Sequence, residues 1–296
     1  MKKNKYILPI IFLLFPISVW SQKSETKVIH YNWKEPAKIY TLPKALKEIS
    51  GISVINDSLI GCIEDEHGIF YLYDLKKNKI QKEIKFSDDG DYEDLTIVKK
   101  DVYVLRNDGE IFKIENYQKK KPVLTHFPSL VPAHDNEGIC YDKNSEKLLI
   151  ACKGKFGKGL TNQFRREIHT YPLKGSKTDT LPLFIIKVDT LLNFAKREKI
   201  QLPTKIKNET VVSILKLRMS GLAIHPTTND VYIVSSFDHA IFIFTQEGKL
   251  KNIQLLDEKI FPQSEGIHFS ENGDLYISNE GKGILPTIVK ISSIEK

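Results

Sequence analysis

The sequence has few of the residues that mark common kinds of site. It contains three cysteines, two methionines and two tryptophans in 296 residues. No cysteine and histidine spacing matches a zinc site, which excludes the usual structural zinc modules. Cys62, Cys140 and Cys152 each lie in an apolar run, so we expect buried free thiols. Cys140 and Cys152 lie on neighbouring strands of one hairpin, and a disulfide between them would require matching register.

Signatures of phosphate binding and nucleophilic catalysis are missing too. The Gly-rich residues 154–159 lack the Lys-Ser/Thr pair that closes a phosphate loop. Ser235 and Ser236 have no base close to them in sequence, and the histidines are scattered, so no nucleophilic triad is indicated. Lys-rich turns such as 119–121 lack interleaved aromatic residues, and we expect no nucleic-acid binding.

A long uncharged run occurs at the N-terminus, where residues 6–20 follow a lysine-rich start. Because spanning a bilayer takes about 20 apolar residues, the pattern predicts a secretory signal peptide, residues 1–21, cut before Gln22. The alternative is an uncleaved membrane anchor. We expect export to the periplasm or cell envelope, or secretion. Loss of the signal removes three lysines and no acid, and it lowers the net charge from +7 to +4.

A repeat organises the remaining chain. A polar or acidic residue, a small residue and an aliphatic recur in register, with spacings of 43, 44, 83 and 45 residues. The five copies are Ser50-Gly51-Ile52, Glu93-Asp94-Leu95, Glu137-Gly138-Ile139, Ser220-Gly221-Leu222 and Glu265-Gly266-Ile267. Four short strands separated by Asn, Asp, Gly and Lys turns fill each regular period, which is typical of a propeller blade.

We therefore predict an all-β fold, a single five-bladed β-propeller over residues 38–296, preceded by a lead-in of residues 22–37. The last copy lacks a fourth strand, and residues 38–42 are predicted to supply it and close the ring. The long third spacing is predicted to hold insertions at residues 153–166 and 190–217, the second containing a short helix and a loop. The alternative is six blades, with a degenerate copy in that interval.

The residues at the starts of the first strands are predicted to converge on one rim of the central channel. Side chains two positions earlier should face the same side, since side chains alternate along a strand. The acidic members of this ring are Glu93, Glu137, Glu265, Asp91, Asp135 and Glu48. The ends of the second strands add further acids, among them Asp65 and Glu280.

Carboxylates gathered in a narrow mouth repel one another unless something compensates their charge. Oxygen ligands in an irregular ring suit Ca²⁺, so we predict a calcium site. The alternative is that each glutamate accepts hydrogen bonds from backbone N–H groups or pairs with Arg106, Lys153 or Arg218.

An ordered set of short motifs resembles the SdiA-regulated family of exported bacterial proteins. These motifs are Glu48-Ile49-Ser50-Gly51, Asp65-Glu66-His67-Gly68, Gly90-Asp91-Tyr92-Glu93, Asn136-Glu137-Gly138, Cys152-Lys153 and Gly273-Asp274-Leu275-Tyr276 to Asn279-Glu280. The resemblance covers residues 38–294. It implies a five-bladed propeller with a calcium site, an N-terminal export or anchor segment and no established reaction. The fourth copy departs from the pattern, because Arg218 and Ser220 replace acids.

Together these observations predict an exported calcium-binding propeller of unassigned activity. Its mouth is expected to bind a small molecule or an envelope protein, and the protein is expected to be a monomer. Contact with a membrane is expected only through an unprocessed N-terminal segment. The alternative function is a calcium-dependent hydrolase of the lactonase or phytase type, in which the metal polarises a carbonyl or phosphoryl oxygen.

Overall fold

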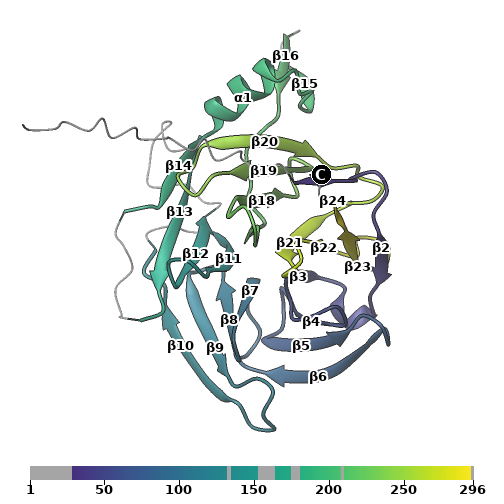
Figure 1. Ribbon diagram of the computed structural model, residues 1–296, viewed down its shortest axis with the longest axis vertical. Helices are drawn as coiled ribbons and strands as arrows, with labels where there is room; N and C mark the ends of the chain where they lie inside the picture. The colour runs from purple at the N-terminus through teal and green to yellow at the C-terminus, as the bar shows by residue number, and fades with distance from the viewer. Residues whose placement is uncertain (1–28, 132–134, 153–163, 175–180, 208–209, 295–296) are drawn as a thin grey trace, which may run out of the picture.

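The computed structural model describes residues 29–131, 135–152, 164–174, 181–207 and 210–294. The predicted signal peptide and most of the predicted insertion at 153–166 lie outside these residues. Five four-stranded antiparallel sheets surround a central axis (Figure 1) and form a five-bladed β-propeller. The alternative of six blades is wrong, since the long third interval contains one blade with additional elements.

Each blade runs from an inner strand at the axis to an outer edge strand. The first three blades are β3 (Ile49–Val54), β4 (Leu59–Glu64), β5 (Ile69–Asp74) and β6 (Lys79–Lys85); β7 (Tyr92–Val98), β8 (Asp101–Arg106), β9 (Glu110–Glu115) and β10 (Val123–Pro128); and β11 (Asn136–Asp142), β12 (Lys147–Cys152), β13 (Arg165–Pro172) and β14 (Phe184–Lys187). The fourth is β17 (Gly221–Ile224), β18 (Val231–Ser235), β19 (Ala240–Phe244) and β20 (Leu250–Leu255).

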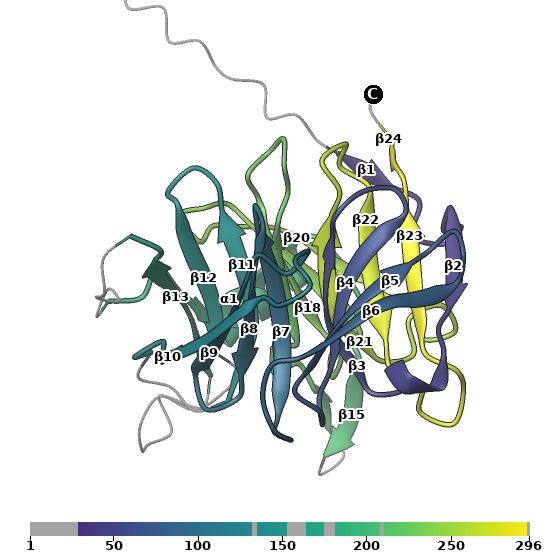
Figure 2. The same cartoon turned by 90° about the horizontal axis from the view of Figure 1, so that it is seen from below.

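The fifth blade joins the two ends of the described chain. It contains β21 (Ser264–Phe269), β22 (Leu275–Asn279) and β23 (Thr287–Ile291), and β2 (Lys38–Thr41) pairs antiparallel with β23 as its outer strand. The predicted ring closure by residues 38–42 is thus confirmed. A second pairing joins β1 (His30–Tyr31) to β24 (Ser293–Ile294) (Figure 2), so part of the lead-in also forms a strand.

The hydrophobic core is divided into five parts, one in each interface between neighbouring blades. The strand β12 shows how a continuous apolar run serves two interfaces. Leu148 and Ile150 pack toward the second blade, whereas Leu149 and Ala151 pack toward the fourth. Because side chains alternate along a strand, β12 contributes to the cores on both of its sides.

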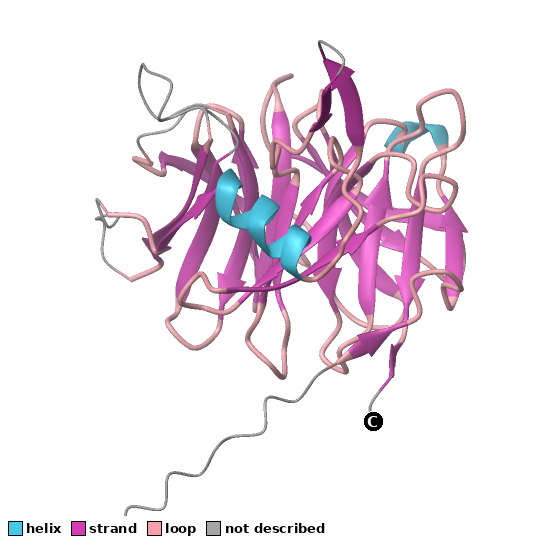
Figure 3. Cartoon of the chain, turned by 90° about the horizontal axis from the view of Figure 1, so that it is seen from above, coloured by secondary structure: helices cyan, strands magenta, loops and turns pink. Residues whose placement is uncertain are grey.

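Additional elements follow the third blade. The predicted helix is present as α1 (Val188–Arg197), which buries Leu191 and Ala195 against the core between blades three and four. The segment expected to be a loop instead contains a hairpin of β15 (Thr204–Lys207) and β16 (Thr210–Ser213). The hairpin projects from the face on which the 3₁₀ helix η1 (Lys44–Leu46) lies (Figure 3).

All three cysteines are buried and free. Cys140 lies opposite Leu149, and Cys152 lies opposite Asn136, so the register does not place the two thiols together. Among the described residues no helix is long and apolar enough to cross a bilayer.

Candidate metal centre at the axis of the propeller

The small residue of the repeat marks the point where neighbouring inner strands come closest. A Cβ atom added to Gly266 would lie 2.5 Å from the carbonyl oxygen of Ser50, and one added to Gly51 would lie 2.6 Å from the Cα atom of Asp94. Such distances are too short for a side chain. The period detected in the sequence therefore reports backbone contacts between adjacent blades.

The residue before the small one lies at a β-bulge in four of the five blades. Register shifts fall between Ile49 and Ile52, Tyr92 and Asp94, Asn136 and Gly138, and Ser264 and Ile267. A bulge adds one unpaired residue and turns its side chain away from the regular alternation. This local geometry directs Glu93, Glu137 and Glu265 toward the mouth of the channel.

Asp94 is the exception among the small residues, because its carboxylate fills space at the axis. Its Oδ1 accepts the N–H of Leu95 at 2.8 Å, and its Oδ2 accepts the N–H of Ile139 from the next blade at 2.9 Å. The side chain is 1% exposed, and this burial raises the pKa of Asp94 well above its ordinary value. Asp94 thus joins blades two and three below the mouth.

A cavity of about 430 Å³ opens at the starts of the inner strands, where the sequence predicted a rim of acids. Its lining residues are Ser50, Asp65, Asp91, Glu93, Asn107, Asp135, Glu137, Ser220, Gln263, Glu265 and Glu280. Five of the six predicted acids are in this set. The sixth, Glu48, lies beside two of the lining residues. Asn107 was not predicted, although it follows the end of β8 as Asp65 follows β4.

The closest group of carboxylates joins blades one and five. Glu48, Asp65 and Glu280 each offer an oxygen, and these oxygens all lie within 4.8 Å of one another. Two backbone hydrogen bonds hold the segments together: Asp65 N–H donates to Glu48 O at 3.1 Å, and Gly281 N–H donates to Lys47 O at 2.8 Å. We call these three acids the carboxylate trio.

The trio carries a charge that its surroundings compensate only in part. Lys47 pairs with Glu48, and the amide of Gln263 donates to Glu280. The Oδ1 atom of Asp65 is buried and has no hydrogen-bond partner among the described residues. Burial, followed by the neighbouring carboxylates, raises the pKa of Asp65 to about 6 and that of Glu280 to about 7.

The other predicted acids line the cavity without forming such a close group among the described residues. Glu93 accepts the side-chain N–H of Asn107 at 3.0 Å. Arg106, a predicted partner for these acids, pairs with Asp108 at 2.8 Å instead. Lys153 lies outside the described residues. The closest group of acids thus joins blades one and five, whereas the sequence motifs are richest in acids in blades two and three.

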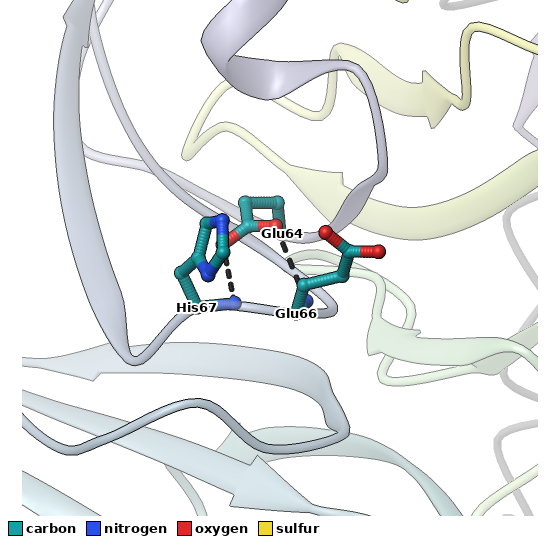
Figure 4. A group of neighbouring side chains, drawn as sticks. All are labelled: Glu64, Glu66 and His67. Carbon is teal, nitrogen blue, oxygen red and sulfur yellow. Dashed lines mark hydrogen bonds between the residues drawn. The ribbon is translucent and has the colours of Figure 1, made fainter.

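A second acidic group, Glu64, Glu66 and His67, lies at the end of β4 (Figure 4). The oxygens of Glu64 are already used, because they accept the backbone N–H groups of Glu66 at 3.2 Å and His67 at 2.6 Å. His67 also bonds Asp89 at 3.1 Å. The group acts as the cap of its own turn and is a weaker candidate for a cation.

The opposite end of the channel holds a histidine and serine pair. Nε2 of His268 lies 3.2 Å from Oγ of Ser53, and Nδ1 accepts the N–H of Val54 at 3.2 Å. The proton of the neutral ring is therefore on Nε2, which donates to the serine. Such a histidine cannot take the serine proton, so the pair lacks the arrangement of a base and its nucleophile.

Comparisons with known proteins support the fold and go no further. No protein-family model matches the chain, and no curated protein matches its sequence. Glutaminyl cyclase from Myxococcus xanthus superimposes with a TM-score of 0.55 at 10% identity, covering 88% of this chain and 95% of that one. The PQQ-bound aldose sugar dehydrogenase from Streptomyces coelicolor gives 0.52 at 9% identity, covering 88% and 98%. A streptogramin B lyase gives 0.50 at 14% identity, covering 87% and 97%.

At these identities the likeness establishes a propeller and leaves the chemistry open, since one fold serves many functions. The structural neighbours are propellers whose names describe different reactions. The function must be argued from the mouth of the channel.

Proposed function

We propose that the protein is an exported propeller that binds Ca²⁺ at the carboxylate trio. The observation that carries the proposal is the buried Oδ1 atom of Asp65, which lines the cavity beside Glu48 and Glu280 and has no hydrogen-bond partner among the described residues. A buried carboxylate oxygen without a donor costs free energy, and a cation removes that cost.

The donor set fits calcium better than a transition metal. Calcium takes six to eight oxygen ligands in irregular geometry. The trio supplies carboxylate oxygens, and the wall of the cavity adds the acids and amides of the rim. Sulfur and imidazole ligands, which favour zinc or copper, do not belong to the trio. The bound ion would leave coordination positions open toward the cavity for a small molecule or an envelope partner.

Calorimetric titration of the metal-stripped protein with CaCl₂ tests the proposal. We expect one site, a rise in the melting temperature on saturation, and loss of both in the double variant Asp65→Asn, Glu280→Gln. Mg²⁺ is expected to bind more weakly, because it demands regular octahedral geometry at shorter distances. The matched control is Glu66→Gln, an exposed acid of the neighbouring group, which should bind Ca²⁺ as the unchanged protein does.

The proposal would be overturned if the folded protein released or absorbed no heat on titration with CaCl₂ and its melting temperature did not change. Equal loss of binding in Glu66→Gln and in the double variant would move the site away from the trio.

Export rests on the first 21 residues and has its own test. Expression in a Gram-negative host followed by mass spectrometry of the intact chain is expected to show an N-terminus at Gln22 and recovery from the periplasm. A chain that retains Met1 in the membrane fraction would favour the uncleaved anchor, and one that retains it in the cytoplasm would contradict export.

A further inference from the structure

Blade four differs from the others at the ring position two residues before the motif. Asp91, Asp135 and Gln263 occupy this position in blades two, three and five, and all three line the cavity. Blade four has Arg218 there. Its guanidinium carbon lies 4.9 Å from the centre of the Phe237 ring, in the loop that joins β18 to β19.

A second cation lies over the same ring. The Nζ atom of Lys216 is 4.8 Å from the ring centre, and Phe237 remains 38% exposed. We call Lys216, Phe237 and Arg218 the basic platform. The platform adjoins the cavity, because Ser236, next to Phe237, donates its N–H to Oγ of Ser220, a residue of the cavity wall, at 3.3 Å.

No carboxylate neutralises the platform among the described residues. Asp238, an acid next to Phe237, is buried and accepts the backbone N–H groups of Lys216 at 2.9 Å and Arg218 at 3.3 Å. It also accepts the hydroxyl of Ser235 at 2.6 Å. Asp238 therefore fixes the backbone of the platform. Among the described residues no acid forms an ion pair with the side chain of Lys216 or Arg218.

A third cation lies behind the platform. Arg166 is buried and donates to the carbonyl oxygens of Leu217 at 2.8 Å and Lys216 at 2.9 Å. The buried Asp238 offsets part of its charge, and Arg166 and Arg218 still act on each other as like charges. Cations held close to one another repel, and an anion placed between them relieves that repulsion.

We propose that the basic platform is an anion subsite of the mouth and that the ligand is a small molecule with a carboxylate or phosphate group. Lys216 and Arg218 hold the oxyanion, and Phe237 offers a flat apolar face beside it. A second oxygen of the ligand reaches the Ca²⁺ at the trio. The proposal deepens the proposed function and rests on it for this second contact alone. The cavity of about 430 Å³ is within the usual size of small-molecule sites.

Titration with phenyl phosphate, benzoate and benzyl alcohol tests the subsite and separates the two anion classes from an uncharged ring. Binding is measured by calorimetry in the metal-free protein and in the presence of saturating Ca²⁺. We expect at least one of the two anions to bind without metal, more tightly with Ca²⁺, and benzyl alcohol not to bind. Arg218→Gln and Lys216→Gln should each weaken anion binding about tenfold, the usual cost of one charge-assisted contact.

The matched control is Lys249→Gln, an exposed lysine in the β19–β20 turn of the same blade at the other end of the channel. It should leave anion binding unchanged. Failure of both anions to bind, or equal binding by folded Arg218→Gln and the unchanged protein, would overturn the subsite. Calcium titration of Arg218→Gln separates the two proposals. Anion binding that depends on Arg218 without any calcium binding would support the subsite and contradict the cation.

Discussion

The two ends of the central channel are formed by the same inner strands, yet they differ in backbone pairing and in chemistry. At the start of β21 a bulge presents Glu265 to an open cavity, while three residues later, about 10 Å along the strand, His268 crosses to Ser53 of blade one. Burial and neighbouring charges raise the pKa values of Asp65 and Glu280 at the mouth, whereas desolvation lowers that of His268 to about 4. Bulges thus direct acidic side chains to one end, and at the other end regular pairing holds a histidine whose charged form is disfavoured.

The largest expected effect comes from the residue that lies between the two ends. Asp94→Ala removes a buried carboxylate and leaves the N–H groups of Leu95 and Ile139 without their acceptor. We expect the free energy of unfolding to fall by roughly 3–5 kcal/mol. Urea unfolding followed by circular dichroism measures this change.

Asp57→Ala, in an exposed turn of blade one, is the control and should cost under about 0.5 kcal/mol. A similar small loss in both variants would show that Asp94 does not hold the inner strands together, and the contrast between the two ends would then need another cause.

The second prediction concerns the acidic end in the metal-free protein. The pKa values of Asp65, about 6, and Glu280, about 7, exceed those of the unfolded chain, near 4. Between these values the folded protein binds more protons, so its free energy of unfolding falls as the pH rises from about 4 to about 7. We expect a fall of roughly 2–3 kcal/mol after allowance for partial exposure.

Denaturant titrations at several pH values measure this slope. The double variant Asp65→Asn, Glu280→Gln should lose this slope. Glu66→Gln should keep most of it, because Glu66 is a minor cause of the raised pKa of Asp65. Saturating Ca²⁺ should flatten the slope in the unchanged protein by displacing the protons. Identical slopes in all three proteins would contradict the electrostatic account of the trio.

The blade number and the ring closure could both be predicted from the sequence. The period predicted the blade number because each small residue corresponds to a backbone contact, such as that of Gly266 with Ser50. The missing fourth strand of blade five predicted closure by residues 38–42, since an open edge must be paired. Both features follow from local rules that repeat along the chain.

The carboxylate trio could be predicted only in part. The motifs predict that Glu48, Asp65 and Glu280 lie near one rim, but the distances between them depend on how blades one and five meet, which the segments themselves do not specify. Asp94 was counted as one of the small residues, because only the structure shows that its carboxylate fills the axis. The stacking of Lys216 and Arg218 on Phe237 likewise depends on a loop held by Asp238.

The third prediction concerns His268, at the opposite end of the channel. The pKa of His268 is lowered to about 4, below the 6.5 of an unfolded histidine, so the unfolded chain binds more protons between these values. The contribution of His268 to stability is present above pH 6.5 and is lost as the pH falls toward 4. Between pH 7 and pH 4.5 the free energy of unfolding is expected to change by about 1–2 kcal/mol less in His268→Gln than in the unchanged protein. An unchanged difference would show that folding does not keep the ring neutral.

The smallest expected effect is the coupling between His268 and Ser53. A double-mutant cycle with His268→Gln and Ser53→Ala isolates it, because Ser53 also accepts the N–H of Ile97 at 3.2 Å and the single variants contain that loss. We expect a coupling energy of about 0.5–1 kcal/mol at pH 7, the net value of one hydrogen bond. A base that accepted the serine proton would activate Ser53 as a nucleophile; a ring that donates to it holds blade five against blade one. Rapid labelling of Ser53 by a fluorophosphonate, abolished in His268→Gln, would therefore contradict the donor assignment even if the coupling energy were as expected.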